Sequence, residues 1–330
     1  MKTLPPIDQP LEEDEAEAAF GAMLDGEQQA EDIAAFLVAL SDRGETAAEI
    51  AGAARAMRAR MIPITAPANA IDVCGTGGDG HHTLNVSTAV SLVVAACGVP
   101  VAKHGNRAAS SKAGAADTLE ALGLDLDRAA ETAEATLGDL GICFLFAGRH
   151  HPSMGRIMPI RKQLGRRTIF NLMGPLANPA GVRRQLAGIA RPAYVPIYAE
   201  ALARLGTDHS LVVSGDEGLD ELSLAGGNEV AEIRGESLRM TRVDPAEAGL
   251  PHSPIDAIRG GDPAHNAAEL RKLLAGEHGP YRNAVLFNAA GALLVAGEVE
   301  SWAEGVEEAA ETIDKGLAKA LLDCWISTTS

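Results

Sequence analysis

The sequence predicts an α/β protein in which a small helical N-terminal domain precedes a larger α/β domain with a mainly parallel central sheet. Two observations predict this class. Residues 11–62 show only the apolar spacing of helices, whereas from residue 70 onward short apolar runs alternate with helical patterns. Strands that alternate with helices pair in parallel, because each connection crosses over the sheet before the next strand begins.

Two prolines separate these regions of the chain. Pro63 and Pro67 interrupt the helical pattern, which predicts a linker near 63–69. Two domains follow from this division: a helical domain over 1–69, completed by mid-chain helices at about 156–181, and an α/β domain over 70–330.

The helical region contains its own start signals. Thr46 followed by Glu49 is the pattern of a capping box, in which each side chain bonds the backbone of the other residue. The acidic run at 12–15 suits a solvated first turn, because the positive end of the helix dipole favours carboxylates. Four apolar side chains follow the i, i+3, i+4, i+7 spacing of one helix face: Ile33, Phe36, Leu37 and Leu40.

The larger region is expected to alternate between strands and helices. Six short apolar runs are strand candidates, at 70–74, 99–103, 142–146, 186–190, 210–214 and 229–234. Helical patterns are expected at 87–97, 114–122, 194–205, 264–275, 281–296 and 301–325. Gly98 and Gly123 each stand just after a helix candidate, where glycine readily adopts the left-handed backbone that ends a helix.

The composition excludes several classes of protein. The formal net charge is −17, and a surface of that sign repels nucleic acid and anionic membranes. No apolar run reaches the roughly 18–20 residues of a membrane-spanning helix, and the acidic N-terminus does not resemble a secretory signal. We therefore expect a cytoplasmic protein without nucleic-acid or membrane partners. Its four cysteines, none in a CxxC pair, are expected to be buried free thiols.

A glycine-rich loop follows the first strand candidate, at residues 75–80 (GTGGDG). Its GxGxxG spacing alone is a weak signal for a dinucleotide site, which also needs an acidic residue at the end of the next strand. Here that strand ends in Lys103 and His104, and the loop lacks the Lys-Ser/Thr pair of a P-loop. We interpret the loop as a turn whose backbone can approach a phosphate closely.

Two further segments favour a phosphate site. Ser87 and Thr88 lie where a helix begins, and the free N–H groups and dipole of a helix start favour an anion. Their hydroxyls could instead cap the helix or hold a metal. Residues 103–111 (KHGNRAASS) gather two cations, a histidine, an amide and two hydroxyls. This suits a polyphosphate cradle better than an ordinary basic surface loop, because an acidic protein needs local positive charge to bind anions.

Asp220 and Glu221 are adjacent carboxylates in a glycine-rich loop after a strand candidate. The pattern suits Mg²⁺, which takes few protein oxygens and completes its shell with substrate phosphates. Solvated acidic residues are the alternative, and Asp216 and Glu217 are competing ligands that spacing does not exclude. No acid or cysteine falls at zinc-ligand spacing near the paired histidines, and the sequence contains no GxSxG motif.

Several long motifs resemble the anthranilate phosphoribosyltransferase family, in one collinear order from about residue 11 to 325. They are residues 75–88, 103–123, 151–179, 218–224 and 288–293. The resemblance implies the fold of the pyrimidine nucleoside phosphorylase-like phosphoribosyltransferases and a homodimer packed through the helical domain. It also implies Mg²⁺-dependent transfer of the phosphoribosyl group of phosphoribosyl pyrophosphate, bound by the α/β domain, to the amine of anthranilate in tryptophan biosynthesis.

The resemblance implies a role for individual residues. Phosphoribosyl pyrophosphate would be bound by two segments: Gly75, Gly78, Asp79, Thr83, Asn85, Val86, Ser87 and Thr88, and then Lys103, His104, Gly105, Asn106, Arg107, Ala108, Ala109, Ser110, Ser111 and Ala115. Anthranilate would be bound by Gly75, His104, Asn106, Arg161 and Pro175, and Mg²⁺ by Ser87, Asp220 and Glu221.

The residue chemistry agrees with that reaction. Pyrophosphate leaves an oxocarbenium-like centre, so the protein must neutralise the leaving charge and align the amine. Mg²⁺ and Lys103 suit the first task, and Arg161 suits the second because a guanidinium grips a carboxylate in a bidentate fork. No strong base is required, since the amine attacks through its own lone pair.

Three positions depart from the family pattern. Ser214 stands where the family often has His, Gly148 where a Pro commonly follows Phe-Ala, and Ala115 in place of a frequent Ser. None removes a charge that the chemistry needs. Two alternatives are a pyrimidine nucleoside phosphorylase-like enzyme and a non-catalytic, nucleic-acid-binding paralogue. The intact Asn106-Arg107 pair disfavours the first, and the net charge of −17 disfavours the second.

Overall fold

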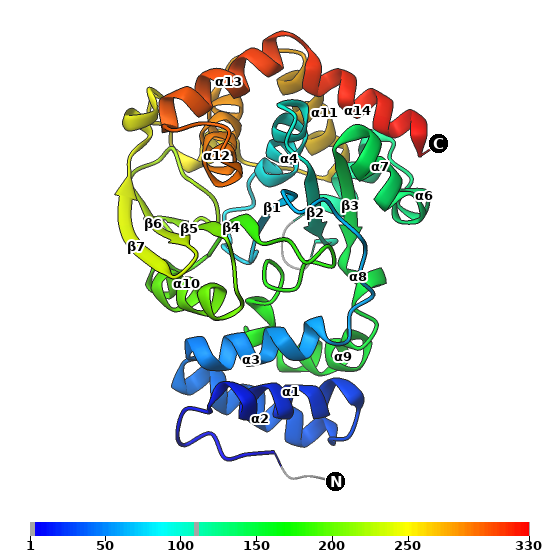
Figure 1. Ribbon diagram of the computed structural model, residues 1–330, viewed down its shortest axis with the longest axis vertical. Helices are drawn as coiled ribbons and strands as arrows, with labels where there is room; N and C mark the ends of the chain where they lie inside the picture. Colours follow the sequence, from blue (N-terminus) through cyan, green and yellow to red (C-terminus); the bar gives the residue numbers. More distant parts are fainter. Residues whose placement is uncertain (1–3, 109–111, 330) are drawn as a thin grey trace.

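A computed structural model describes residues 4–108 and 112–329 (Figure 1). Three helices form the N-terminal region: α1 (Glu13–Asp25), α2 (Ala30–Arg43) and α3 (Ala47–Arg58). The capping box expected at Thr46 and Glu49 starts α3, and three acidic residues lie in the first turn of α1, so both start signals are confirmed. In Figure 1 these helices lie at one end of the molecule, far from the C-terminal helix.

The mid-chain segment is only partly helical. Helix α9 (Met154–Leu164) packs against α1 and α2, but it ends at Gly165, whose φ is 60°. The helix expected across 165–181 is wrong: that stretch contains one short 3₁₀ turn, η1 (Ile169–Asn171). Its apolar side chains are buried in the same cluster as the N-terminal helices. The packing of α9 supports our division of the chain at residue 69, which stays a prediction.

One sheet of seven strands carries the larger domain. The strands are β1 (Ile71–Gly75), β2 (Val101–Gly105), β3 (Ile142–Phe146), β4 (Arg184–Gly188), β5 (His209–Gly215), β6 (Asn228–Arg234) and β7 (Ser237–Val243). Their order is β3-β2-β1-β4-β5-β6-β7, parallel from β3 to β5 and antiparallel at β6 and β7. The mainly parallel sheet is confirmed, and β7 is a strand that the apolar pattern did not predict.

Helices cover the sheet and connect its strands. Their bounds are α4 (Val86–Ala96), α5 (Ala115–Leu122), α6 (Leu126–Glu131), α7 (Ala133–Leu140), α8 (Ala147–His150), α10 (Val195–Arg204), α11 (Pro263–Leu274), α12 (Pro280–Ala296), α13 (Trp302–Asp314) and α14 (Leu317–Thr328). Short 3₁₀ turns lie at η2 (Pro192–Tyr194), η3 (Pro245–Ala248) and η4 (Ile255–Ile258). Gly316 divides the helix expected over 301–325. No helix in the described ranges is long and apolar enough to cross a bilayer.

The strands bury both faces, as expected for a parallel sheet. Ile71 and Val73 of β1 belong to the apolar cluster under α4 and α12, whereas Ala187 of β4 and Val212 of β5 belong to the cluster shared with α10 and the N-terminal helices. Because side chains alternate between faces along a strand, the two clusters lie on opposite sides of the sheet.

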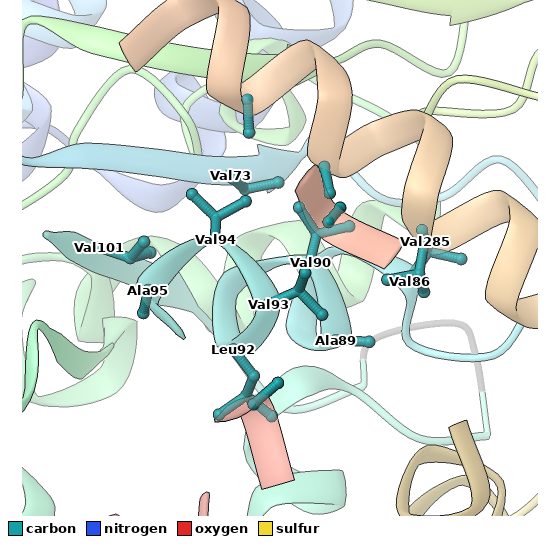
Figure 2. Close-up of a cluster of buried hydrophobic side chains, with 14 of the residues drawn as sticks. Val73, Val86, Ala89, Val90, Leu92, Val93, Val94, Ala95, Val101 and Val285 are labelled. Carbon is teal, nitrogen blue, oxygen red and sulfur yellow. The ribbon is translucent and has the colours of Figure 1, made fainter. Parts of the chain in front are cut away.

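Helix α4 is buried on most of its circumference. Figure 2 shows Val73 of β1 and Val101 of β2 packed against it, with Val285 of α12 beside its first turn. Helices α12 and α14 also pack on it. A helix enclosed in this way keeps a fixed position. Its N-terminus is therefore a rigid boundary for the loops beside it.

The cysteine prediction is partly correct. All four thiols are free, and Cys74 and Cys143 are buried in the sheet. Cys97 is only partly buried, and Cys324 is exposed on α14, so burial is wrong for Cys324.

Candidate active site

The candidate site lies where the chain changes direction across the sheet. From β1 the chain adds β2 and β3 on one side, and β4 and β5 extend the sheet from the other side of β1. Gly75 and Gly188, paired in register, end β1 and β4 at this switch point. In open α/β sheets, ligands bind outside the carboxyl ends of the strands at such a point.

Asp220 occupies the space that these two glycines leave open. A Cβ on Gly188 would overlap the Asp220 carbonyl oxygen, and a Cβ on Gly75 would overlap its carboxylate. The Gly77 N–H donates to Asp220 Oδ2 at 2.6 Å, which ties the glycine loop to this carboxylate. Gly75, predicted to touch both substrates, therefore also makes room for a predicted metal ligand.

Glu221 connects the same segment to the start of α4. The Ser87 N–H donates to Glu221 Oε1 at 2.9 Å, while Oε2 is buried and bonds no partner among the described residues. Asn288 of α12 fixes the segment from behind: Leu222 N–H donates to Asn288 Oδ1, and Asn288 Nδ2 donates to the Leu222 carbonyl, each at 2.9 Å. One small pocket is lined by Gly75, Ser87, Asp220 and Glu221 together.

The carboxylates repel one another in the absence of a cation. Burial, followed by repulsion from Asp79, raises the pKa of the Asp220 carboxyl to about 7. Burial and the adjacent Asp220 raise the pKa of Glu221 well above its ordinary value. These groups, with the orphaned oxygen of Glu221, fit a hard divalent cation that keeps most of its shell for water and phosphate. In the described ranges, no cluster of three His, Cys, Asp or Glu residues has metal-binding geometry.

The competing carboxylates are engaged elsewhere. Asp216 pairs with Arg242 at 2.7 Å, and Glu217 accepts a hydrogen bond from the Ser223 hydroxyl. The pocket is lined by Asp220 and Glu221 but by neither of these residues, which favours Asp220 and Glu221 as metal ligands.

Lys103 is a buried cation without an acidic partner. Its side chain is 3% exposed at the end of β2, and its Nζ donates to the Val73 carbonyl at 2.9 Å and to Ser87 Oγ at 3.4 Å. No carboxylate in the described part of the chain lies within ion-pair distance of it. Its hydrogen-bond acceptors are neutral, and its charge acts on the carboxyls of Asp72 and Glu221 without a direct bond, so a second anion nearby would stabilise the buried ammonium further. It therefore favours an anion in the adjacent crevice.

The glycine loop adopts left-handed backbone at three positions, with φ of 72° at Gly77, 75° at Gly78 and 82° at Gly80. Only glycine adopts such values without strain, which explains the composition of the loop. Asp79 Oδ1 accepts the His81 N–H at 3.1 Å, and Thr83 forms a β-bridge with Arg259 after the loop.

Several predicted residues at the start of α4 face the protein interior. Asn85 Oδ1 accepts from Thr118 at 2.5 Å and from Asn266 at 2.8 Å, so this amide braces α5 and α11 against the loop. Val86 is buried in the core, and the buried Thr88 hydroxyl has no hydrogen-bond partner in the described part of the structure.

The loop after β2 is organised by Asp117, at the start of α5. Its Oδ2 accepts the N–H groups of Ala108 and Gly114, each at 2.9 Å. Arg107 pairs with Asp117 at 3.0 Å and with Glu120, and Asn106 is exposed. Three predicted residues of this segment lie outside the described residues: Ala109, Ser110 and Ser111.

Small residues pack tightly at the base of this loop. A Cβ on Gly105 would lie 2.7 Å from the Phe144 ring and 3.2 Å from the Ala115 methyl. Ala115 thus packs beside Gly105 at the start of α5.

His104, at the end of β2, bonds the residue that precedes Pro175. His104 is 3% exposed, and its Nδ1 donates to the carbonyl of Gly174, next to Pro175, at 2.8 Å. Burial, together with the neighbouring His151, lowers the pKa of His104 to about 3, so its ring is neutral. That hydrogen bond leaves its buried Nε2 as an acceptor without a partner in the described ranges.

Arg161 is a partly buried cation on α9. Burial lowers the pKa of its guanidinium, and its Nη1 lies 3.6 Å from Met158 Sδ. No acidic side chain of the described residues pairs with it. An arginine without an acidic partner can donate two parallel hydrogen bonds to the carboxylate of a ligand.

Sequence reasoning missed three supporting residues. Asp72 is fully buried in β1 and accepts the His104 N–H at 3.1 Å and the Asn178 amide at 2.8 Å, so it fixes the end of β2. Burial raises the pKa of Asp72 to about 6. Arg167 and the bracing role of Asn288 were also missed. Asp72 could have been identified from the sequence, because a charged residue inside an otherwise apolar strand is an unusual pattern.

Two of the departures have structural surroundings that accommodate them. The Ser214 hydroxyl donates into the turn that follows β5, to the Leu219 carbonyl at 3.5 Å. Gly148 lies in α8, where a Cβ would approach the Phe146 ring at 3.0 Å.

Comparison with known proteins gives the class. The protein-family model described as "Glycosyl transferase family, helical bundle domain" matches residues 7–61, and the family model described as "Glycosyl transferase family, a/b domain" matches residues 67–319. Fold and site thus define a two-domain glycosyl transferase.

Individual relatives narrow this class. The anthranilate phosphoribosyltransferase of Novosphingobium aromaticivorans is 82% identical over 99% of both chains. The crystal structure of that enzyme from Thermus thermophilus is similar with a TM-score of 0.91 and 45% identity, covering 97% of this chain and 96% of that one. The Saccharomyces cerevisiae enzyme in complex with PRPP and Mg has a TM-score of 0.89 and 29% identity, with coverage of 97% and 93%. The chain belongs to the anthranilate phosphoribosyltransferase family.

Proposed function

We propose that the protein transfers the phosphoribosyl group of phosphoribosyl pyrophosphate to the amine of anthranilate, releasing pyrophosphate, in tryptophan biosynthesis. One observation carries the proposal: the glycine loop, the buried Lys103 and the Asp220–Glu221 pair meet at one switch point. The relatives favour neither a nucleoside phosphorylase nor a nucleic-acid-binding paralogue, which were the alternatives.

The diphosphate would lie between the glycine loop and the start of α4. Lys103 supplies the positive charge there, and the glycine backbone lets the loop approach the phosphates closely. Asp220, Glu221 and the Ser87 hydroxyl would hold Mg²⁺, as the orphaned oxygen of Glu221 supports. When bound, the ion neutralises charge that builds on the leaving pyrophosphate. The complex of the yeast relative with PRPP and Mg supports this dependence.

Anthranilate would be oriented by its carboxylate. Arg161 has no acidic partner among the described residues and would hold that group, while the neutral His104 and Pro175 line the approach. The amine nitrogen forms a bond to the anomeric carbon as the bond to the pyrophosphate oxygen breaks, and the amine then loses a proton. The protein's part is therefore positioning and electrostatics, with no covalent intermediate.

We further propose that the protein is a cytoplasmic homodimer that pairs through α1–α3. The support is the resemblance of its helical domain to that of the family. Sedimentation or scattered light at micromolar concentration would test it, and a monomeric mass would contradict it.

The activity is tested by the fluorescence of anthranilate. Fluorescence should fall when purified protein, phosphoribosyl pyrophosphate and Mg²⁺ are all present. Omission of any one should leave it constant. Constant fluorescence with all components present would contradict the proposal, and loss of activity with EDTA but not with its magnesium complex would support the metal requirement.

A further inference from the structure

Arg167 is a cation that joins two parts of the molecule. It lies between α9 and η1, and its Nη1 donates to the carbonyl of Gly78 in the glycine loop at 2.8 Å. Its own carbonyl accepts the Ser41 hydroxyl, at the end of α2, at 3.3 Å. One residue thus spans from the N-terminal helices to the loop that we assign to the diphosphate.

The contact lies at one of the left-handed positions of that loop. Gly78 has a φ of 75°, and a Cβ on it would lie 2.7 Å from Arg167 Nη1, so a side chain at this position would displace the guanidinium. A run of glycines loses more conformational entropy on ordering than other residues. The charge-assisted hydrogen bond from Arg167 therefore restricts the loop before the substrate binds. This lowers the conformational entropy that the loop loses on binding.

Arg167 also bears on the charge of the site. Burial, followed by the nearby Arg191, lowers the pKa of its guanidinium, whereas Asp220 and Asp79 act in the opposite direction. No acidic side chain of the described residues forms an ion pair with Arg167. Its charge thus faces the carboxylates around the loop and offsets part of their repulsion.

The neighbouring Arg166 offers a matched comparison. Arg166 is exposed and pairs with Asp42 on α2, so it makes an ordinary surface ion pair. The two arginines have the same charge and adjacent positions, but only Arg167 reaches the loop.

We infer that Arg167 is a positioning residue for the transfer reaction. Through its hydrogen bond to the Gly78 carbonyl, it holds the glycine loop in the conformation that binds the diphosphate. Through its own carbonyl, it connects the loop to the helical domain. This inference rests on the proposed function. It assigns to Arg167 no contact with either substrate.

The test compares Arg167→Met, Arg167→Lys and Arg166→Met by steady-state kinetics and by calorimetric binding of phosphoribosyl pyrophosphate with Mg²⁺. We expect R167M to raise both the KM and the Kd for phosphoribosyl pyrophosphate about tenfold, with the KM for anthranilate within twofold of wild type. R167K, which keeps one donor but lacks the fork, should recover part of the loss. R166M should behave as wild type.

The outcomes separate the two claims. If wild-type protein neither binds phosphoribosyl pyrophosphate nor consumes anthranilate, the proposed function fails. If wild type is active and R167M binds phosphoribosyl pyrophosphate as tightly, the inference about Arg167 is overturned. An equal rise in the anthranilate KM also overturns it, because the effect would then be general. If R167M does not fold, a threefold or larger rise in the Kd of R167K supports the inference, and no rise overturns it.

Discussion

The carbonyl oxygen of Asp220 lies in the space that a side chain on Gly188 would fill. Gly188 is the last residue of β4. Asp220 lies in a later loop, just before Leu222, to which Asn288 is hydrogen-bonded. The end of the strand and this loop are therefore in direct contact. The loop that we propose as the metal site can reach the switch point only because β4 ends in glycine.

Gly188→Ala is therefore expected to displace Asp220. The added methyl must move the loop backbone, so Mg²⁺-dependent turnover should fall at least a hundredfold while the protein remains folded. Turnover across a Mg²⁺ titration and a thermal melt would measure both effects. Gly226→Ala is the control, because a Cβ there meets no atom within 4 Å. Normal turnover in G188A would show that Asp220 need not occupy this position.

Proton and metal binding should compete at Asp220. The pKa of its carboxyl is raised to about 7, so the group is protonated below that pH in the metal-free protein. At limiting Mg²⁺, we expect the apparent Mg²⁺ affinity to fall by up to about tenfold per pH unit between pH 7 and 5.5, and excess Mg²⁺ should restore turnover. Asp220→Asn should weaken this dependence, because only Glu221 then competes for protons and metal, and it should remove most activity, whereas Asp216→Asn should preserve both. A Mg²⁺ affinity that does not change with pH would contradict the assignment.

Arg161→Ala should act mainly on anthranilate. Loss of a charge-assisted carboxylate contact is worth about 1.5–3 kcal/mol, which corresponds to a rise in the anthranilate KM of roughly 10- to 100-fold. The KM for phosphoribosyl pyrophosphate should change little. Steady-state kinetics with each substrate varied in turn provide the measurement. A larger effect on phosphoribosyl pyrophosphate would mean that Arg161 serves the other substrate.

Asn288→Ala should weaken both stability and metal binding. The change removes two buried hydrogen bonds to Leu222, which predicts a loss of about 2–4 kcal/mol in the free energy of unfolding and a Tm lower by several degrees. Mg²⁺ affinity should also fall, because Glu221 loses its support. The control is Asn283→Ala, a partly exposed position on the same helix. An unchanged melting curve would contradict the bracing role.

Apolar periodicity predicted the parallel strands because they are buried on both faces. It could not find β7, whose Leu238 and Met240 flank Arg239 and are themselves exposed at the sheet edge. It misassigned 165–181 because buried coil there repeats the spacing of a helix. Asn178 shows what holds that coil instead, since its side chain bonds Asp72 across the domain.

The charged residues of the site were visible in the sequence, but their support was not. Lys103, Asp220 and Glu221 stand out because ionisable side chains are unusual next to buried strands. Arg167 resembles any surface arginine in sequence, and only the path of the chain brings it to Gly78. The partners of Asn85 lie at residues 118 and 266, a distance along the chain that no local pattern encodes.

The hydrogen bonds between Asn288 and Leu222 have a consequence for folding during synthesis on the ribosome. The glycine loop is synthesised in the first third of the chain, but the helix that braces its opposite wall emerges among the last segments. Nascent protein that lacks α12 would contain every charged group of the site without a pocket to hold a ligand. Phosphoribosyl pyrophosphate with Mg²⁺ would therefore stabilise the chain fully only after α12 has been synthesised.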